Sequence, residues 1–140
     1  MTAGTGVTHS EKNASNDSPV HFLQIWLVPE KAGIAPGYEQ KAFAESELRG
    51  ALRVVASRDG RDGSVTVHQD VTLSAGRFDA NERARAAIAE GRRAFVHVAR
   101  GEVRVMGETL VAGDAMTIHD TREIAFEGTT GGEVLLFDLA

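Results

Sequence analysis

The sequence predicts an all-β protein. Its 140 residues include 15 glycines, and short apolar runs recur between turn-forming segments such as residues 59–63 (DGRDG). Short strands bounded by glycine-rich turns are typical of β-sandwiches and β-barrels. The strongest candidate strand is residues 21–28 (HFLQIWLV), which is rich in aromatic and β-branched residues and is ended by Pro29. Phe22 and Trp26 share one face of this strand, so we expect them in the core, with a pocket wall as the alternative.

The other expected elements follow in chain order. Residues 4–11 are predicted to be a turn that leads into a strand, residues 12–19 (KNASNDSP) a loop, and residues 30–37 a linker or crossover. Short strands are predicted at residues 52–57, 64–68, 71–75, 94–99, 102–106, 115–119, 123–126 and 133–139. Residues 81–90 (NERARAAIAE) are ambiguous, because alanine favours a helix but Ile88 is the only large apolar residue there.

The second half of the chain predicts a small barrel. Residues 98–107 are predicted to form a hairpin in which Val103 and Val105 share one face and Arg104 lies on the other. A Gly113–Asp114 corner and a further apolar strand follow. Glycine-turned hairpins of this kind are typical of cupin barrels, where glycine supplies the positive φ needed at corners between sheets. Several other β-sandwiches share the pattern.

Composition excludes several classes of function. The formal net charge of −5 and the pI near 5.5 argue against nucleic acid or an anionic membrane as the main partner. The absence of cysteine excludes disulfides, thiolate metal sites and thiol nucleophiles. The first residues carry no signal-peptide pattern, and the apolar stretch at residues 22–28 is too short to span a bilayer. We therefore expect a cytoplasmic protein.

The triplet His9-Ser10-Glu11 is the strongest candidate for chemistry. Residues i and i+2 of a strand point to the same face, so the imidazole and the carboxylate project together. This pair of ligand types suits iron, manganese, nickel or copper. A His-x-Glu spacing is also common by chance, and a surface pair is the more frequent explanation when the motif stands alone.

The remaining histidines have simpler structural explanations. His21 begins the strongest strand and is expected to pack or form a hydrogen bond, and His68 is expected to be structural. His97 has no second histidine or acid two residues away, and His119 is expected to be exposed beside Asp120 at a strand end. We therefore expect the second barrel to hold no metal of its own.

Three segments carry a resemblance to a known family. Residues 1–43, with the run AGTGVTHSE, residues 62–70 (DGSVTVHQD) and residues 133–139 (EVLLFDL) resemble the pirins, which include bacterial pirin-like quercetin dioxygenases. The resemblance covers essentially the whole chain and implies an all-β fold with a C-terminal cupin, a double-stranded β-helix of the jelly-roll type. It also favours a strand or extended chain at residues 81–90.

The resemblance implies three parts. Residues 1–30 correspond to a remnant of an N-terminal cupin with the HSE motif, residues 31–51 to a linker, and residues 52–140 to the C-terminal cupin of a bicupin. In the family, the histidine and glutamate of that motif are two of four metal ligands, which correspond here to His9 and Glu11. The other two are histidines of an H-x-H motif on an earlier strand. Because that strand precedes Met1, we expect a truncated frame, a misassigned start or a split gene.

The resemblance implies a metal-dependent dioxygenase that cleaves flavonols such as quercetin, with Glu11 as acceptor of the substrate's hydroxyl proton. Iron is the expected metal, with nickel, copper and manganese as alternatives. Two ligands hold an ion weakly, so we expect the chain alone to be inactive. The alternative is a non-enzymatic regulatory module that binds proteins. Expected partners are an aromatic, flavonol-like substrate and either a companion N-terminal half or a second copy of the chain, recruited by unpaired strand edges.

Overall fold

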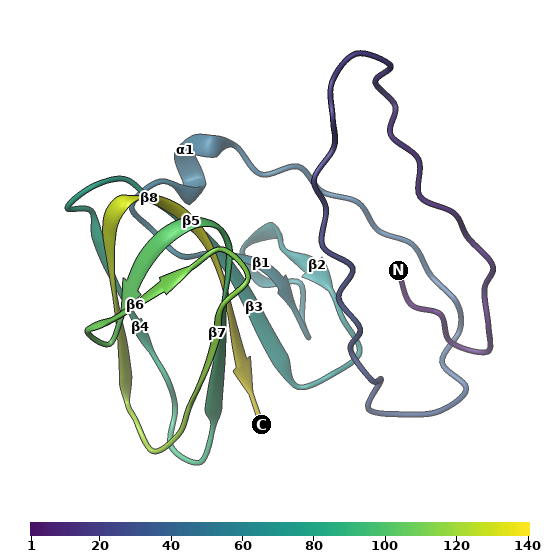
Figure 1. Cartoon of the computed structure of the whole chain (residues 1–140). Helices are drawn as coiled ribbons and strands as arrows, with labels where there is room; N and C mark the ends of the chain where they lie inside the picture. Colours follow the sequence, from purple (N-terminus) through teal and green to yellow (C-terminus); the bar gives the residue numbers. More distant parts are fainter.

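The computed structural model describes all residues, 1–140. It consists of a β-barrel and, beside it, a long extended N-terminal segment, drawn purple and blue in Figure 1. The elements are α1 (Glu45–Leu48), β1 (Arg53–Ser57), the 3₁₀ turn η1 (Arg61–Gly63), β2 (Val65–Thr66), β3 (Val71–Phe78), β4 (Arg83–Ala87), β5 (Arg93–Val105), β6 (Glu108–Val111), β7 (Ala115–Ile118) and β8 (Glu123–Leu139). The all-β prediction is therefore confirmed.

Two long strands organise the barrel. The sheet order is β2-β1-β3-β8-β5-β6, with β4 also paired to β8 and β7 also paired to β5. The 17-residue strand β8 pairs with β4 through its first residues and with β3 through its last ones, so it belongs to both sides of the barrel. The register between β5 and β8 shifts at two places, and such bulges bend paired strands. The bends allow the sheet to curl on itself.

A close approach of two backbones marks one of these bends. Gly101, in the middle of β5, has φ +64°, a conformation that other residues seldom adopt. A Cβ atom at this position would lie 2.0 Å from the carbonyl oxygen of Gly131 on β8. Only glycine at this position therefore allows the backbones of β5 and β8 to approach so closely where the strands bend.

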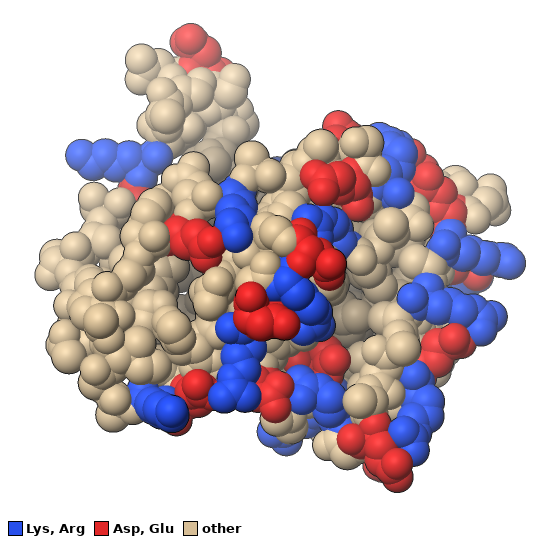
Figure 2. Space-filling model, turned by 180° about the vertical axis from the view of Figure 1, so that it is seen from behind, with Lys and Arg blue, Asp and Glu red and all other residues tan.

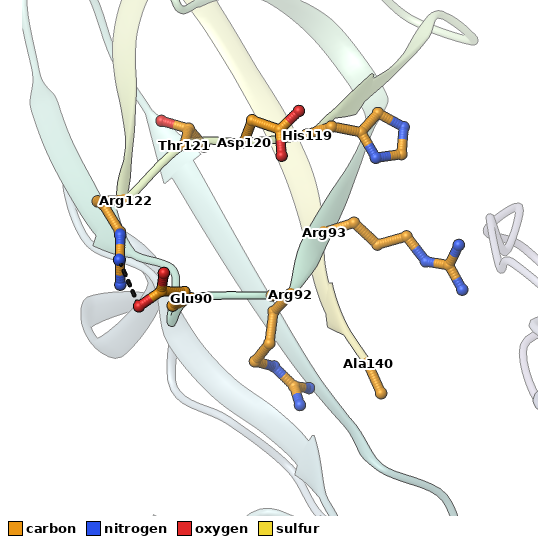
Figure 3. A pocket seen from close by; sticks show the side chains of 9 residues that line it. Glu90, Arg92, Arg93, His119, Asp120, Thr121, Arg122 and Ala140 are labelled. Carbon is orange, nitrogen blue, oxygen red and sulfur yellow. Dashed lines mark ion pairs between the residues drawn. The ribbon is translucent and has the colours of Figure 1, made fainter.

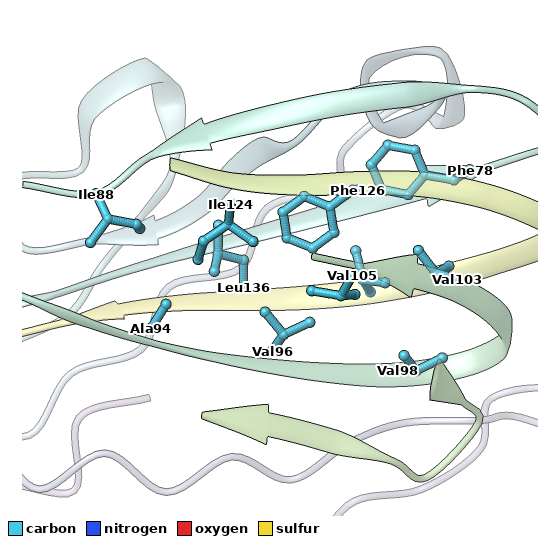
Figure 4. Packing of buried hydrophobic residues seen from close by; sticks show 11 residues of the cluster. Phe78, Ile88, Ala94, Val96, Val98, Val103, Val105, Ile124, Phe126 and Leu136 are labelled. Carbon is cyan, nitrogen blue, oxygen red and sulfur yellow. The ribbon is translucent and has the colours of Figure 1, made fainter. Parts of the chain in front are cut away.

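The interior of the barrel is filled by apolar side chains. Eleven buried residues form this cluster, and Figure 4 shows them converging from the surrounding strands: Phe78, Ile88, Ala94, Val96, Val98, Val103, Val105, Ile124, Phe126, Val134 and Leu136. They alternate with outward-facing residues along β5 and β8, as the period of a strand requires. The interior is thus a packed core.

A second, smaller apolar cluster lies outside the barrel. Its four buried residues are Ala56, Val71, Leu73 and Phe137. The ring of Phe137 meets that of Phe95 edge to face at 5.7 Å between centroids. Leu27, from the N-terminal segment, packs against this cluster. The outer face of β3 and β8 is therefore the surface on which the N-terminal segment rests.

Two predictions for the N-terminal segment are wrong. Residues 4–11 and residues 21–28 form no strand, and residues 7–28 make no backbone–backbone hydrogen bond at all. The residues Phe22 and Trp26, expected in the core, are 59% and 87% exposed. The reason is that β-propensity needs a partner strand, and none lies alongside this segment in the chain.

The predicted hairpin at residues 98–107 is wrong in position, and two strands predicted as separate are one. Residues 98–105 continue a single strand, β5, and the hairpin turn lies at Met106 and Gly107, between β5 and β6. The predicted strands at residues 123–126 and 133–139 are the two ends of β8. The ambiguous residues 81–90 contain the strand β4, as the resemblance implied. None of the helices is long and apolar enough to cross a membrane.

Candidate metal centre

A tight turn precedes the candidate ligands. The amide of Gly6 donates to the carbonyl of Ala3 at 2.8 Å, and Gly4 has φ +54°. Thr2 and Gly37 exchange two backbone hydrogen bonds of 2.8 and 3.0 Å, which tie the start of the segment to its return. From this turn the chain runs extended through the HSE triplet.

The structure brings His9 and Glu11 together. Their Nε2 and Oε1 atoms lie 3.7 Å apart, with side chains 38% and 65% exposed. Two ligands of one ion, each about 2.1 Å from it, lie at most about 4.2 Å apart, so the pair fits two coordination positions. The expected shared face is present although no strand forms there, because extended chain has the same two-residue period.

No third ligand completes this pair. The structure contains no cluster of three or more histidine, aspartate or glutamate side chains arranged to hold a metal. His9 and Glu11 would therefore supply one imidazole nitrogen and one carboxylate oxygen to a metal ion. The metal-binding role of both residues stays a prediction, and the donor chemistry fits part of a site.

The other histidines lie elsewhere. The ring Nδ1 of His21 accepts a hydrogen bond of 3.0 Å from Nε of Arg100, as expected of a hydrogen-bonded residue. The side chain of His68 is exposed, and its carbonyl accepts the amide of Glu30 at 2.8 Å. His97 is half-buried on β5, and His119 is exposed beyond β7.

A polar pocket opens at one end of the barrel. It has a volume of about 530 Å³ and is lined by Glu90, Gly91, Arg92, Arg93, His119, Asp120, Thr121, Arg122 and Ala140 (Figure 3). Arg122 and Glu90 form an ion pair of 2.7 Å across it. Its single apolar lining residue gives an aromatic substrate little to bind.

Arg92 is the best-anchored charge of this pocket. Its Nε donates to Asp138 at 2.5 Å and its Nη1 to Asp70 at 2.9 Å. Partial burial disfavours the cation, but the two aspartates outweigh this effect and raise the pKa of Arg92. The sequence alone gave no sign of this residue, because its partners Asp70 and Asp138 lie far from it in the chain.

A second shallow pocket, of about 500 Å³, lies over β4, β5 and β8. Arg83 and Arg104 flank Glu127 there, with the Arg83 hydrogen bond at 3.0 Å. That bond lowers the pKa of Glu127, and the charges of both arginines lower it further. Figure 2 shows such interleaved charges over the barrel, whereas the N-terminal segment carries few.

Comparisons with known proteins place this chain among cupins. Residues 54–139 match the family of quercetinase C-terminal cupin domains. Over 139 residues the chain is 40% identical to a quercetin 2,3-dioxygenase of Escherichia coli K12, covering 99% of this chain and 59% of that protein. The expected cupin fold is confirmed by this match and by two solved structures.

Both solved structures are of YhhW from Escherichia coli. The first superposes with a TM-score of 0.76 at 36% identity, over 82% of this chain and 48% of YhhW. The second is described as bacterial pirin YhhW in complex with nickel(II); its TM-score is 0.73 at 39% identity, over 79% of this chain and 47% of that one. This chain thus spans 59% of the E. coli dioxygenase and about half of YhhW.

Proposed function

The chain belongs to the pirin family of cupin proteins, and from this premise we propose that it forms part of a metal-dependent dioxygenase that cleaves flavonols such as quercetin. One observation carries the proposal: Nε2 of His9 and Oε1 of Glu11 lie 3.7 Å apart, near enough to bind one ion. The name of the 40% identical E. coli relative supports the substrate class.

His9 and Glu11 are the proposed metal ligands. His9 supplies an imidazole nitrogen and Glu11 a carboxylate oxygen, a mixed set that divalent iron, nickel, copper and manganese all accept. Iron remains the first expectation, and the nickel(II) complex of YhhW makes nickel the first alternative. A bound divalent ion would supply Lewis acidity towards a substrate oxygen.

Glu11 also has a proposed role in proton transfer. Its side chain is 65% exposed, so a substrate hydroxyl can reach the carboxylate. With one carboxylate oxygen directed to an ion, the other is free to accept the hydroxyl proton of a flavonol as a general base. Glu11→Gln keeps the shape of the side chain and removes this basicity.

The remaining donors are proposed to come from a companion segment that carries an H-x-H motif. Residues 1–30 would then be part of a metal-bearing cupin and residues 52–140 a second one, with residues 31–51 between them. Two protein ligands exposed to solvent hold an ion weakly, because affinity grows with ligand count and with an organised shell around the ligands. The chain alone is therefore proposed to be inactive towards flavonols.

Metal titration of the chain tests the site directly. Isothermal titration with Ni²⁺ and Fe²⁺ is expected to give weak binding that His9→Ala or Glu11→Gln abolishes, while Ser10→Ala leaves it unchanged. Quercetin consumption is then measured for the chain alone and with a companion H-x-H segment added, with activity expected only in the mixture. Metal binding that survives both ligand substitutions would refute the assignment.

A second candidate function is a non-enzymatic module that binds proteins. The observation in its favour is the exposed apolar run at residues 20–28, in which Trp26 is 87% exposed. Large exposed apolar patches mark interaction sites. If metal-loaded chain with its companion segment consumes no quercetin, while the Trp26→Ser variant loses a protein partner that the unmodified chain binds, this function replaces the enzymatic one.

A further inference from the structure

The end of the extended N-terminal segment is fastened to residues 58–69, the stretch that joins β1 to β3 and contains β2. The segment lies on this side of the barrel in Figure 1. The amide of Glu30 donates to the carbonyl of His68 at 2.8 Å, and its carboxylate pairs with Arg58 at 2.6 Å. The side chain of Glu30 is 26% exposed, so solvent screens this pair less than an open surface pair. Backbone and side chain of one residue thus hold the segment to the barrel.

A second contact lies beside the first. Nε2 of Gln69 donates to the carbonyl of Val28 at 2.7 Å. Oε1 of the same side chain accepts the amide of Asp70 at 2.7 Å, which fixes the orientation in which Gln69 reaches Val28. Leu27 packs on the outer apolar cluster. Residues 27–30 are therefore held by apolar, hydrogen-bonding and ionic contacts together.

Residues 31–38 form a loop whose other end returns to the same stretch of the barrel. Oε2 of Glu39 accepts the amide of Thr66 at 2.7 Å. Nζ of Lys41 donates to the carbonyl of Ser64 at 2.5 Å and pairs with Glu39 at 2.7 Å. The bond from Lys41, and after it the amide of Thr66, lower the pKa of Glu39 below 4.5. One short stretch of the barrel therefore holds both ends of the loop.

The loop in turn holds the turn that precedes the HSE triplet. Thr2 and Gly37 exchange two backbone hydrogen bonds, of 2.8 and 3.0 Å. A Cβ atom at Gly4 would collide with the carbonyl oxygen of Ile34, so the turn and the loop lie in backbone contact. Contacts thus run without interruption from the barrel through the loop to the start of the segment that carries the triplet.

We propose that residues 58–69 act as a clamp that positions the HSE triplet relative to the barrel. The positioning residues are Arg58 and Gln69 on the barrel and Glu30 and Glu39 on the loop. The interior of the barrel is filled by its own apolar core, so what the barrel offers to a site on the segment is a fixed surface. A catalytic site needs ligands held in a precise arrangement, and a rigid scaffold supplies that precision. The purpose of the clamp rests on the proposed function, because it is to present the triplet to the remaining metal donors.

The clamp acts on the position of the ligands and not on their spacing. His9 and Glu11 are two residues apart, so extended chain alone keeps Nε2 and Oε1 3.7 Å apart. Residues 7–20 make no backbone–backbone hydrogen bond, so the place of this pair relative to the barrel depends on the tethers at either end. Loosening the clamp should therefore leave the weak binding of one ion unchanged, and should disturb a site that also needs donors from a companion segment.

Distances between spin labels test the clamp without metal. The chain has no cysteine, so Thr8→Cys on the segment and Thr109→Cys on β6, both at exposed residues, give one labelled pair. Double electron–electron resonance should show one narrow distance between the labels. Combining Glu39→Ala with Gln69→Ala removes a contact at each end of the loop and should replace the narrow distance by a broad distribution. A broad distribution in the labelled chain without these changes, or a narrow one in this double variant, overturns the proposal.

Two variants at neighbouring residues are the matched controls. The side chain of His68 is exposed, and only the carbonyl of this residue takes part in the clamp. The side chain of Gln40 bonds to Tyr38 within the linker. His68→Ala and Gln40→Ala should therefore keep the narrow distance, and broadening as large as that of the double variant would refute the assignment of the positioning residues.

Charge reversal and amide exchange show whether the effect is local. Arg58→Glu sets two carboxylates against each other and should broaden the distribution, and adding Glu30→Arg should narrow it again. In the double variant the amide of Gly37 should exchange faster with solvent, whereas the amide of Val96, a core residue, should exchange as before. Equal acceleration at both amides would mean that the whole barrel loosens, which overturns a clamp as the cause.

Activity separates the clamp from the proposed function. The double variant and the unmodified chain are titrated with Ni²⁺, and both are assayed for quercetin consumption with the companion H-x-H segment added. Equal Ni²⁺ affinity with a loss of quercetin consumption in the double variant supports a positioning role, and equal consumption by both overturns it. If the unmodified chain with its companion consumes no quercetin, the proposed function fails, and the label distances decide by themselves whether the clamp holds the segment.

Discussion

Phe78 and Phe126 stack inside the barrel with ring centroids 5.9 Å apart and planes inclined by 5°. They come from β3 and β8, and both side chains are almost wholly buried. Because β3 pairs with the last residues of β8 and Phe126 lies near the start of β8, the stack joins parts of the barrel that no backbone ladder links directly. This contact closes one end of the core.

Removing one ring of this stack should destabilise the barrel. Phe126→Ala is expected to lower the free energy of unfolding by about 3–5 kcal/mol, through lost burial and the cavity left behind. Tyr38→Ala, at a residue that is 75% exposed, is the matched control and should change stability by less than about 0.5 kcal/mol. Urea denaturation of the three proteins measures both values. Similar losses in the two variants would contradict the packing described here.

The corner at Gly101 gives a second prediction. Gly101 and Gly107 both have positive φ, of +64° and +92°, but a Cβ at Gly107 would meet nothing within 4 Å. Gly107→Ala should therefore cost only the strain of the left-handed backbone, about 1–2 kcal/mol. Gly101→Ala must also move the carbonyl of Gly131, which adds roughly 1–4 kcal/mol of angle and peptide-plane distortion. Thermal unfolding of both variants compares them, and equal stabilities would mean that β5 and β8 do not touch at the corner.

The same glycine explains why the barrel could be predicted only in part. The alternation of inward and outward residues around Val103 and Val105 was predictable, and both residues are fully buried. The glycine at 101 was taken for a hairpin turn, whereas it bends a continuous strand. Local sequence cannot separate these cases, because the outcome depends on whether β8 runs alongside.

In the N-terminal segment the error is the reverse, because a strand was expected where none forms. Residues 21–28 have the strongest strand propensity of the chain, and no strand forms there because no partner is in reach. The proximity of His9 and Glu11 was predictable from a two-residue period alone, which an extended chain keeps without a sheet. The ion pairs of Arg92 were not predictable, because Asp70 and Asp138 come from distant parts of the sequence.

A third prediction concerns the acid side of stability. The amide of Ala44 and Nε of Arg53 donate to the carboxylate of Glu47 at 2.8 and 3.0 Å, and these bonds, the amide first, lower the pKa of Glu47 below 4.5. A carboxyl whose pKa is lower in the folded state stabilises the fold above the pKa of the unfolded chain, and this contribution disappears as the pH falls through the folded pKa. Glu47→Gln should therefore be less stable at pH 6 and should lose less stability between pH 5 and pH 3. Glu108→Gln, at a residue without an ion pair, should follow the unmodified protein, and parallel curves for all three would refute the role of Glu47.

The last prediction concerns Arg92, which holds β5 to the end of β8 and to the loop before β3. Its side chain is 20% exposed and that of Asp138 is 22% exposed, so Arg92→Met leaves a half-buried carboxylate without its partner. Hydrogen bonds to charged groups contribute about 1.5–3 kcal/mol, and the loss of unfolding free energy at pH 7 should fall in that range. Arg93→Met, at the neighbouring residue that is exposed and forms no ion pair, should be close to neutral. Urea denaturation at low and high salt distinguishes a shielded ion pair from a surface charge. Salt screens a partly buried pair less than a pair on the surface, so the loss should persist at high salt. A loss that vanishes in high salt would mean that Arg92 acts only as a surface charge, and the end of β8 would then be held by its backbone ladder alone.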